Sequence, residues 1–180
     1  MQPFWKCVFT IGSRLKAAPY LSILIYHQIL PEPDELRFDG VDASQFAQQM
    51  NWVKDHFNVL PLNVALQRMK QGCMPSRSAC ITFDDGYLDN FSIALPILKK
   101  LNLPASFYVS SQMIGSDYMW HDQIIEVIRH ARKTSIDISG RRFELSSTRQ
   151  KIQFLQFFEM FLRLGFKILF IIFLDFLRCV

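Results

Sequence analysis

Two adjacent carboxylates, Asp84 and Asp85, follow a short apolar run over residues 79–83 and precede Gly86. The run predicts a buried strand, and in α/β folds ligand chemistry gathers where such strands end. Two neighbouring acidic groups repel each other, so one retains its proton or the pair binds a cation. Asp-Asp-Gly is equally typical of an ordinary turn after a strand. The residue types alone leave a catalytic pair and a structural turn both open.

The sequence TFDDGY at residues 82–87 resembles the first motif of the polysaccharide deacetylase (NodB-homology) family. Three further parts of the chain are similar to the family, in the same order: the strand ending in LIYH at 24–27, the helix and strand at 95–98 and 103–109, and MWHD at 119–122. The last is similar to a segment of the bacterial exopolysaccharide branch. The resemblance covers residues 21–150.

The resemblance implies a role for each carboxylate. In that family the first aspartate of the motif is the general base and the second ligates a divalent metal, which gives these roles to Asp84 and Asp85. A bound metal acidifies water and polarises a carbonyl, while a carboxylate within reach takes the proton. The implied reaction is metal-dependent hydrolysis of the acetamide of N-acetylated sugars in a polysaccharide, with Zn²⁺ as the expected ion.

The histidines do not complete the pattern of the family, which takes two further ligands from a His-[Ser/Thr]-x-x-His motif. A carboxylate with two imidazoles is a usual zinc set. This chain has four histidines, none four residues from another, at His27, His56, His121 and His130. The later Arg-x-Pro-[Trp/Tyr] motif is also missing. Impaired activity is therefore expected, and the alternative is an inactive, truncated relative that at most binds carbohydrate.

Three other residues are candidates for the pocket. His27 ends a neighbouring predicted strand and is expected to face the same site, although a hydrogen-bonded or exposed structural histidine is the competing interpretation. Trp120 can stack on a sugar ring or form part of a core. Asp122 can line the pocket or cap a helix. His56 and His130 are expected to be solvated.

Apolar spacing predicts alternating strands and helices. Strands are expected at 21–26, 59–60, 79–83 and 105–110. Helices are expected after Asp42, which with Gln45 resembles a capping box, from Leu62 to Gly72, over 91–101 with a kink at Pro96, and over 122–132. This order predicts βαβ units and a largely parallel sheet. By resemblance, the α/β fold is a deformed (β/α) barrel, truncated after about half its length.

Composition narrows the class of partner. The 180 residues carry a net charge of +4, but residues 21–140 hold ten basic and thirteen acidic groups, which argues against nucleic acid as a partner. A phosphohydrolase is less favoured, because no phosphate-binding glycine loop is present.

The four cysteines form no Cys-x-x-Cys pair, so no disulfide framework is indicated. The apolar run at 7–11 is too short for a convincing signal peptide, which favours a cytoplasmic or membrane-peripheral location.

Three segments are expected: an N-terminal extension (1–20), a partial deacetylase domain (21–150) and an apolar tail (151–180). The longest uninterrupted apolar run of the tail, 168–174, is far shorter than a membrane span. Charges at Glu159, Arg163 and Lys167 make insertion marginal, so an amphipathic helix on the domain or on a membrane surface fits better. A frame change or early end of the coding sequence is a further hypothesis for the change in composition.

Overall fold

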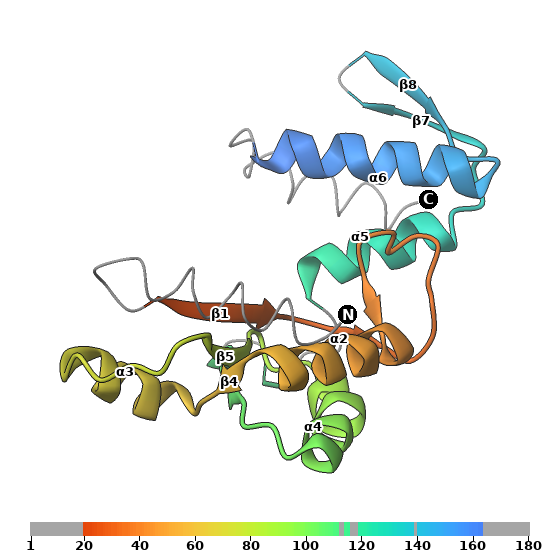
Figure 1. Ribbon diagram of the computed structural model, residues 1–180. Helices are drawn as coiled ribbons and strands as arrows, with labels where there is room; N and C mark the ends of the chain where they lie inside the picture. The colour runs from red at the N-terminus through yellow and green to blue at the C-terminus, as the bar shows by residue number, and fades with distance from the viewer. Residues whose placement is uncertain (1–19, 112–113, 116–118, 139, 164–180) are drawn as a thin grey trace. The chain divides into compact units, whose positions relative to one another are not determined.

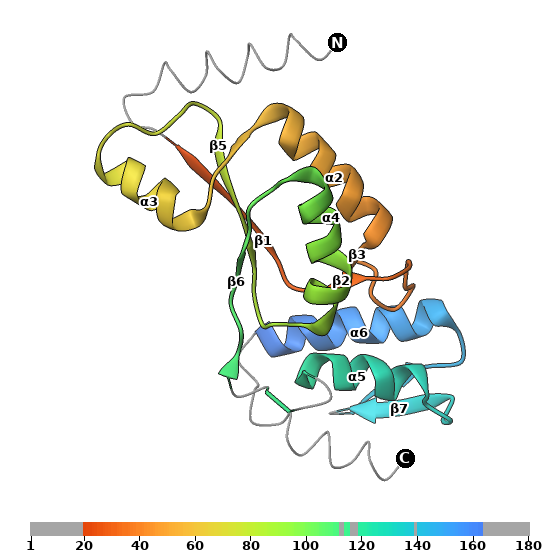
Figure 2. The ribbon, with the colours of Figure 1, turned by 90° about the horizontal axis from the view of Figure 1, so that it is seen from below.

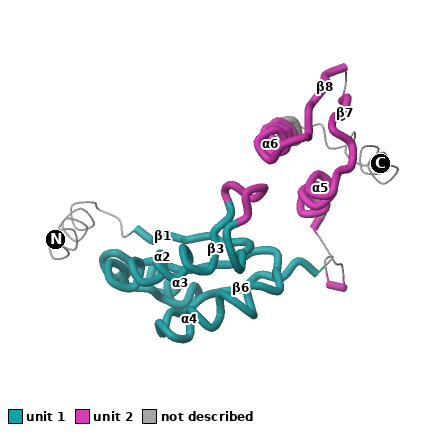
Figure 3. Tube along the Cα trace, turned by 90° about the vertical axis from the view of Figure 1, so that its right-hand side faces the viewer, with its two compact units in different colours: residues 1–33, 40–112 teal, residues 34–39, 113–180 magenta. Residues whose placement is uncertain are grey.

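The computed structural model describes residues 20–111, 114–115, 119–138 and 140–163. They belong to two compact units (Figure 3), the first built from residues 1–33 and 40–112 and the second from 34–39 and 113–180. Each unit has a separate hydrophobic core. The short segment 34–39 therefore belongs to the second unit, although the chain on both sides of it belongs to the first.

The first unit is organised around a parallel sheet. Its strands are β1 (Leu21–Tyr26), β4 (Asn58–Val59), β5 (Ser78–Phe83) and β6 (Ser106–Phe107). The order is β1-β5-β4, and β6 pairs with the C-terminal end of β5. A separate two-stranded parallel pair joins β2 (Ile29–Leu30) to β3 (Val41–Asp42). The predicted parallel sheet and the mixed α/β class are confirmed.

Strand β5 is the centre of this sheet, and all six of its residues are buried. Because Tyr26 of β1 lies opposite Phe83 of β5, the two strands end at the same level. The backbone N–H of Asp84 continues the pairing by donating to the carbonyl of Tyr26 at 2.8 Å. The residues that follow β1 and β5 therefore emerge together at one edge of the sheet.

Helices α2 (Ala43–His56) and α4 (Leu95–Leu101) lie side by side along these strands (Figure 2), and α3 (Leu62–Lys70) follows β4. The carboxylate of Asp42 caps α2 by accepting from the N–H groups of Ser44 and Gln45, as expected for an N-cap. The core beneath combines α2, α4 and strand residues, among them Phe46, Met50, Leu98, Ile81 and Phe83.

The helix after the Asp-Asp turn is irregular in a way that the sequence did not indicate. Residues Asn90–Ala94 form a π-helical turn, η1, and α4 begins only at Leu95. Helical backbone continues from η1 into α4, because Ala94 and Leu95 both have right-handed helical angles. A proline within a helix removes one hydrogen bond and crowds the turn before it, and Pro96 follows the π turn by two residues. The irregularity therefore lies just before Pro96, and the kink itself stays a prediction. Single π turns are frequently found near functional sites.

The second unit contains α5 (Trp120–Arg129), the antiparallel hairpin of β7 (Ser135–Ile138) and β8 (Arg141–Glu144), and α6 (Thr148–Arg163) (Figure 1). Its core joins the two helices and the hairpin, with fully or largely buried side chains at Leu36, Ile124, Ile128, Ile136, Leu145, Phe154, Leu155 and Phe158. Helix α6 thus uses an apolar face in a core, as predicted for an amphipathic helix. Among the described helices, none is long and apolar enough to cross a membrane. The predictions for the N-terminal extension up to residue 19 and for the apolar tail from residue 164 onward concern residues outside the described part.

Several boundaries and environments differ from prediction. Strand β6 is shorter than the predicted 105–110 because its pairing with β5 covers only two residues. His56, expected to be solvated, is buried: a ring nitrogen lies 2.8 Å from the carbonyl oxygen of Trp52, and the ring stacks on Trp52. His130 is exposed, as predicted. Cys80 is a buried free thiol, whose pKa burial raises, and Cys73 is exposed.

Candidate functional site

The two carboxylates of the motif lie where the buried strand β5 ends. Asp84 and Asp85 are both half-buried at the start of a turn. Asp85 has φ of 70° and Gly86 has φ of 74°, so two successive residues lie in the left-handed region. For a residue other than glycine this conformation is uncommon, although Asp tolerates it better than most. Such strain clusters at ligand-binding sites, and here it falls on the residue predicted to ligate a metal.

Gly86 is required by close packing as well as by its backbone angle. A Cβ atom at this position would lie 2.9 Å from Cγ1 and 3.2 Å from Cα of Val109. The segment after β6 therefore passes directly against the turn, and its Ser110 N–H points to the carbonyl of Asp85 at 3.5 Å. The glycine of the motif allows β6 and the turn to come together.

His27 comes next to the carboxylates from the end of the adjacent strand. Its Nε2 atom lies 3.9 Å from Oδ2 of Asp85, and the two side chains are 58% and 34% exposed. The prediction that His27 faces the same site as the Asp pair is thus supported by the position of its ring. The arrangement follows directly from the parallel register of β1 and β5.

These donors fit part of a metal site. Zinc is held at about 2.1 Å by His nitrogen and Asp oxygen, so one ion can contact two atoms 3.9 Å apart. Catalytic zinc sites usually take three protein ligands. Within the part of the chain that the structure describes, no group of three or more His, Cys, Asp or Glu side chains can hold a metal. Asp85 and His27 thus place two donor atoms within reach of one cation, one fewer than such a site usually takes.

The other two predicted pocket residues belong to the second unit. Trp120 begins α5, and its side chain lies outside the described part. Asp122 lies in the first turn of α5, and Met119 is the N-cap, so the alternative prediction of Asp122 as a cap is wrong. Its carboxylate, 6% exposed, pairs with Arg37 at 3.1 Å, which gives it a structural role within this unit.

Asp122 is one member of a charge network that ties segment 34–39 to α5. Arg37 contacts Asp34 at 2.9 Å, Asp122 at 3.1 Å and Glu126 at 3.2 Å, and Arg129 pairs with both Asp34 and Glu126. Burial alone would raise the pKa of Asp34, but hydrogen bonds from Arg129, Arg37 and the Leu36 N–H outweigh it and lower that pKa. The network therefore favours the charged form of the carboxylate.

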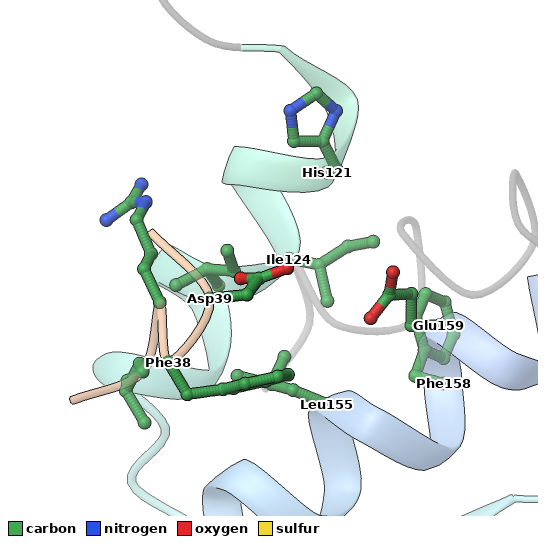
Figure 4. Close-up of a pocket in the computed structure, with 10 residues that line it drawn as sticks. Phe38, Asp39, His121, Ile124, Leu155, Phe158 and Glu159 are labelled. Carbon is green, nitrogen blue, oxygen red and sulfur yellow. The ribbon is translucent and has the colours of Figure 1, made fainter. Parts of the chain in front are cut away.

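An apolar cavity of about 290 Å³ lies beside this network, between α5, α6 and segment 34–39. Its walls include Ile124, Leu155 and Phe158, while the carboxylates of Asp39 and Glu159 lie around it (Figure 4). His121 also lines it, set apart from the two carboxylates. The arrangement is that of a partly open core, with no cluster resembling a metal centre.

Sequence reasoning missed Asp89. Its Oδ1 accepts a hydrogen bond from the backbone N–H of Ile29 at 3.0 Å, which joins the segment after β1 to the segment after β5. The signal available in the sequence was an acidic residue four positions after Asp85, just before the helix. On its own that spacing is equally typical of a helix N-cap.

The chain is similar to known proteins over part of its length. Residues 71–140 match the family model described as polysaccharide deacetylase. The chain is 34% identical over 113 residues to the YxkH protein of Bacillus subtilis, covering 61% of this chain and 39% of that protein. It is 33% identical over 105 residues to the poly-beta-1,6-N-acetyl-D-glucosamine N-deacetylase of Staphylococcus aureus, covering 58% and 36%. It therefore spans less than half the length of these relatives.

Among solved structures, the Streptococcus pyogenes deacetylase PplD in complex with acetate superimposes with a TM-score of 0.48 and 25% identity, covering 59% of this chain and 51% of that one. The family match includes the whole TFDDGY motif at 82–87 and the strand before it. The resemblance to polysaccharide deacetylases that the motif predicts is confirmed over this part of the chain.

Proposed function

We propose that this chain carries part of the active site of a carbohydrate deacetylase, which hydrolyses the acetamide of N-acetylated sugars in a polysaccharide. The observation that supports this most is the meeting of Asp85 and His27 at the ends of two parallel strands, with Asp84 beside them. The proposed fold is a deformed (β/α) barrel, to which the first unit contributes parallel strands and outer helices.

In the proposed reaction, the oxygen of a water molecule attacks the carbonyl carbon of the acetamide, and the carbon–nitrogen bond breaks. The products are acetate and the free amine of the sugar. Asp84, half-buried at the end of β5, accepts the proton that the water loses, and the departing nitrogen gains a proton. A general base held in this way typically contributes about 10²- to 10⁴-fold to the rate.

Asp85 and His27 are proposed to hold a divalent cation, Zn²⁺ in the first instance. When bound, such an ion acidifies water and polarises the carbonyl group. The left-handed backbone of Asp85 and the close approach of Val109 to Gly86 restrict the backbone of the turn that carries the carboxylate, and a restricted backbone lowers the cost of ordering a site.

The proposed substrate class comes from the relatives. One of them is named a poly-beta-1,6-N-acetyl-D-glucosamine N-deacetylase, and an N-acetylated oligosaccharide is therefore the first substrate to test. The alternative is an inactive relative that at most binds carbohydrate.

Acetate release from N-acetylglucosamine oligomers tests the proposal. We expect Asp84→Asn to lower the rate at least a hundredfold, because the amide cannot take the proton. Asp55→Asn, on the exposed side of α2, is the matched control and should retain the wild-type rate. Equal rates for wild type and Asp84→Asn would overturn the assigned base. Binding of the oligomers without acetate release would favour the inactive alternative.

A further inference from the structure

We infer that Asp89 is a positioning residue that holds His27 against Asp85, an inference that rests on the proposed function of that pair. The Oδ1 atom of Asp89 accepts a hydrogen bond of 3.0 Å from the N–H of Ile29. Asp89 thereby connects the loop that carries His27 with the turn that carries Asp85.

Two hydrogen bonds bracket the pair. On one side the N–H of Asp84 donates to the carbonyl of Tyr26 at 2.8 Å, and on the other the N–H of Ile29 donates to Asp89. His27 lies between Tyr26 and Ile29, and Asp85 lies between Asp84 and Asp89. The two short segments are therefore joined both before and after the residues that must meet.

The two hydrogen bonds matter because packing does not hold the imidazole of His27 in place. The His27 side chain is 58% exposed, so few neighbouring atoms restrict it. Ile29, two residues later, is fully buried, and its N–H requires an acceptor. Loss of that acceptor would loosen the backbone of the His27 loop, and the exposed ring would move with it. Outer partners of this kind orient the groups that contact a metal.

The carboxylate of Asp89 makes a long-range contact and not a local one. Asp89 has helical backbone angles directly before η1, and its side chain makes no capping hydrogen bond there. It accepts from the N–H of Ile29, a residue 60 positions away in the sequence. The π turn of Asn90–Ala94 begins immediately after it, as such turns often do near functional sites.

The first experiment follows amide hydrogen exchange of the metal-free full-length chain by NMR. Asp89→Ala should speed exchange at Ile29 by about fivefold or more relative to the amides of α2, because a buried donor loses its acceptor. Asp89→Asn keeps a carbonyl oxygen and should stay within about twofold of wild type. Ser92→Ala, which removes an exposed hydroxyl bonded to the Leu88 carbonyl, is the control. Unchanged exchange at Ile29 in Asp89→Ala would overturn the inference.

The second experiment separates positioning from general stability by measuring Zn²⁺ affinity in a double-mutant cycle. Asp89→Ala should weaken binding about 10- to 100-fold, the usual cost of losing an outer partner, and Asp89→Asn should restore it. In a His27→Ala background, Asp89→Ala should have no further effect, because its influence passes through His27. Additive losses would overturn the positioning role. Zn²⁺ binding that is indifferent to Asp85→Ala would instead contradict the proposed function, while the exchange measurement would still decide on Asp89.

Discussion

The Nε2 atom of His27 lies 3.9 Å from Oδ2 of Asp85. The two residues come from different strands, and their meeting depends on the parallel register of β1 with β5. The backbone hydrogen bond from Asp84 to Tyr26 extends that register by one residue beyond the sheet. A carboxylate and an imidazole, the two groups that zinc prefers among nitrogen and oxygen ligands, thus face each other at the edge where α/β folds place their chemistry.

Gly86→Ala should destabilise the protein by about 2–3 kcal/mol, because it adds a Cβ 2.9 Å from Val109 to a residue already at positive φ. Gly72→Ala is the matched control. Gly72 also has positive φ, but a Cβ there meets nothing within 4 Å, so it should cost only about 1 kcal/mol. Urea unfolding of both variants measures the difference. Equal losses of unfolding free energy in the two variants would show that Val109 leaves room for a side chain at residue 86.

Arg37→Met should lower the free energy of unfolding by about 2–4 kcal/mol, because it removes an arginine that pairs with Asp34, Asp122 and Glu126 in a largely buried network. The methionine keeps most of the apolar stem, which limits the loss of packing. Arg142→Met, which breaks the exposed pair with Glu144, should change stability by about 1 kcal/mol or less. Chemical denaturation at low salt compares them. If Arg37→Met lowers the free energy of unfolding no more than Arg142→Met does, the network does not stabilise the fold.

The contribution of Asp34 to stability should depend on pH. Its pKa is lowered in the folded protein from the usual 3.8, so the charged form binds the arginines more tightly in the native state than in the unfolded chain. The stabilisation is therefore fully present above the unfolded pKa and disappears as the pH falls through the folded value. Asp34→Asn lacks it at every pH.

Denaturation of wild type and Asp34→Asn across a pH series checks this. The difference in unfolding free energy should be constant from about pH 5 to 7 and shrink below about pH 4. Since the network is only partly shielded from solvent, added salt should reduce the difference too. A difference that stays the same at acid pH would mean that the charge of Asp34 contributes nothing.

Phe154→Ala in α6 should cost about 3–5 kcal/mol, the usual loss for a fully buried aromatic side chain. Met160→Ala in the same helix removes a side chain that is 54% exposed, and it should change stability by about 0.5 kcal/mol or less. Thermal and urea unfolding distinguish the two variants. Similar small effects at both positions would mean that α6 does not contribute to a core.

Sequence reasoning found what depends on local pattern. The apolar runs of β1 and β5, the cap at Asp42 and the apolar face of α6 each leave a signal within a few residues, and each is present. The TFDDGY motif pointed to the Asp pair. His27 was placed correctly because parallel strands end at the same edge of a sheet.

What sequence reasoning missed depends on tertiary contacts. The role of Asp89 requires knowing that Ile29 lies opposite it, and the pairing of Asp122 with Arg37 joins segments far apart in the chain. The burial of His56 depends on its stacking with Trp52. The π turn of Asn90–Ala94 leaves no periodicity in the sequence by which it could be predicted. The proline that follows it indicates only that the helix is irregular nearby.

The most direct test of the central claim is a Zn²⁺ titration of the purified chain by calorimetry, beside Asp85→Ala and the distant control Asp55→Asn. If Asp85 and His27 hold a metal, wild type and Asp55→Asn should bind one equivalent, and Asp85→Ala should lose the site. Because losing a residue that binds the metal directly costs more than losing an outer partner, the affinity should fall by more than about 100-fold. Binding of equal strength in all three proteins, or none in wild type, would contradict the assignment of Asp85 as a ligand.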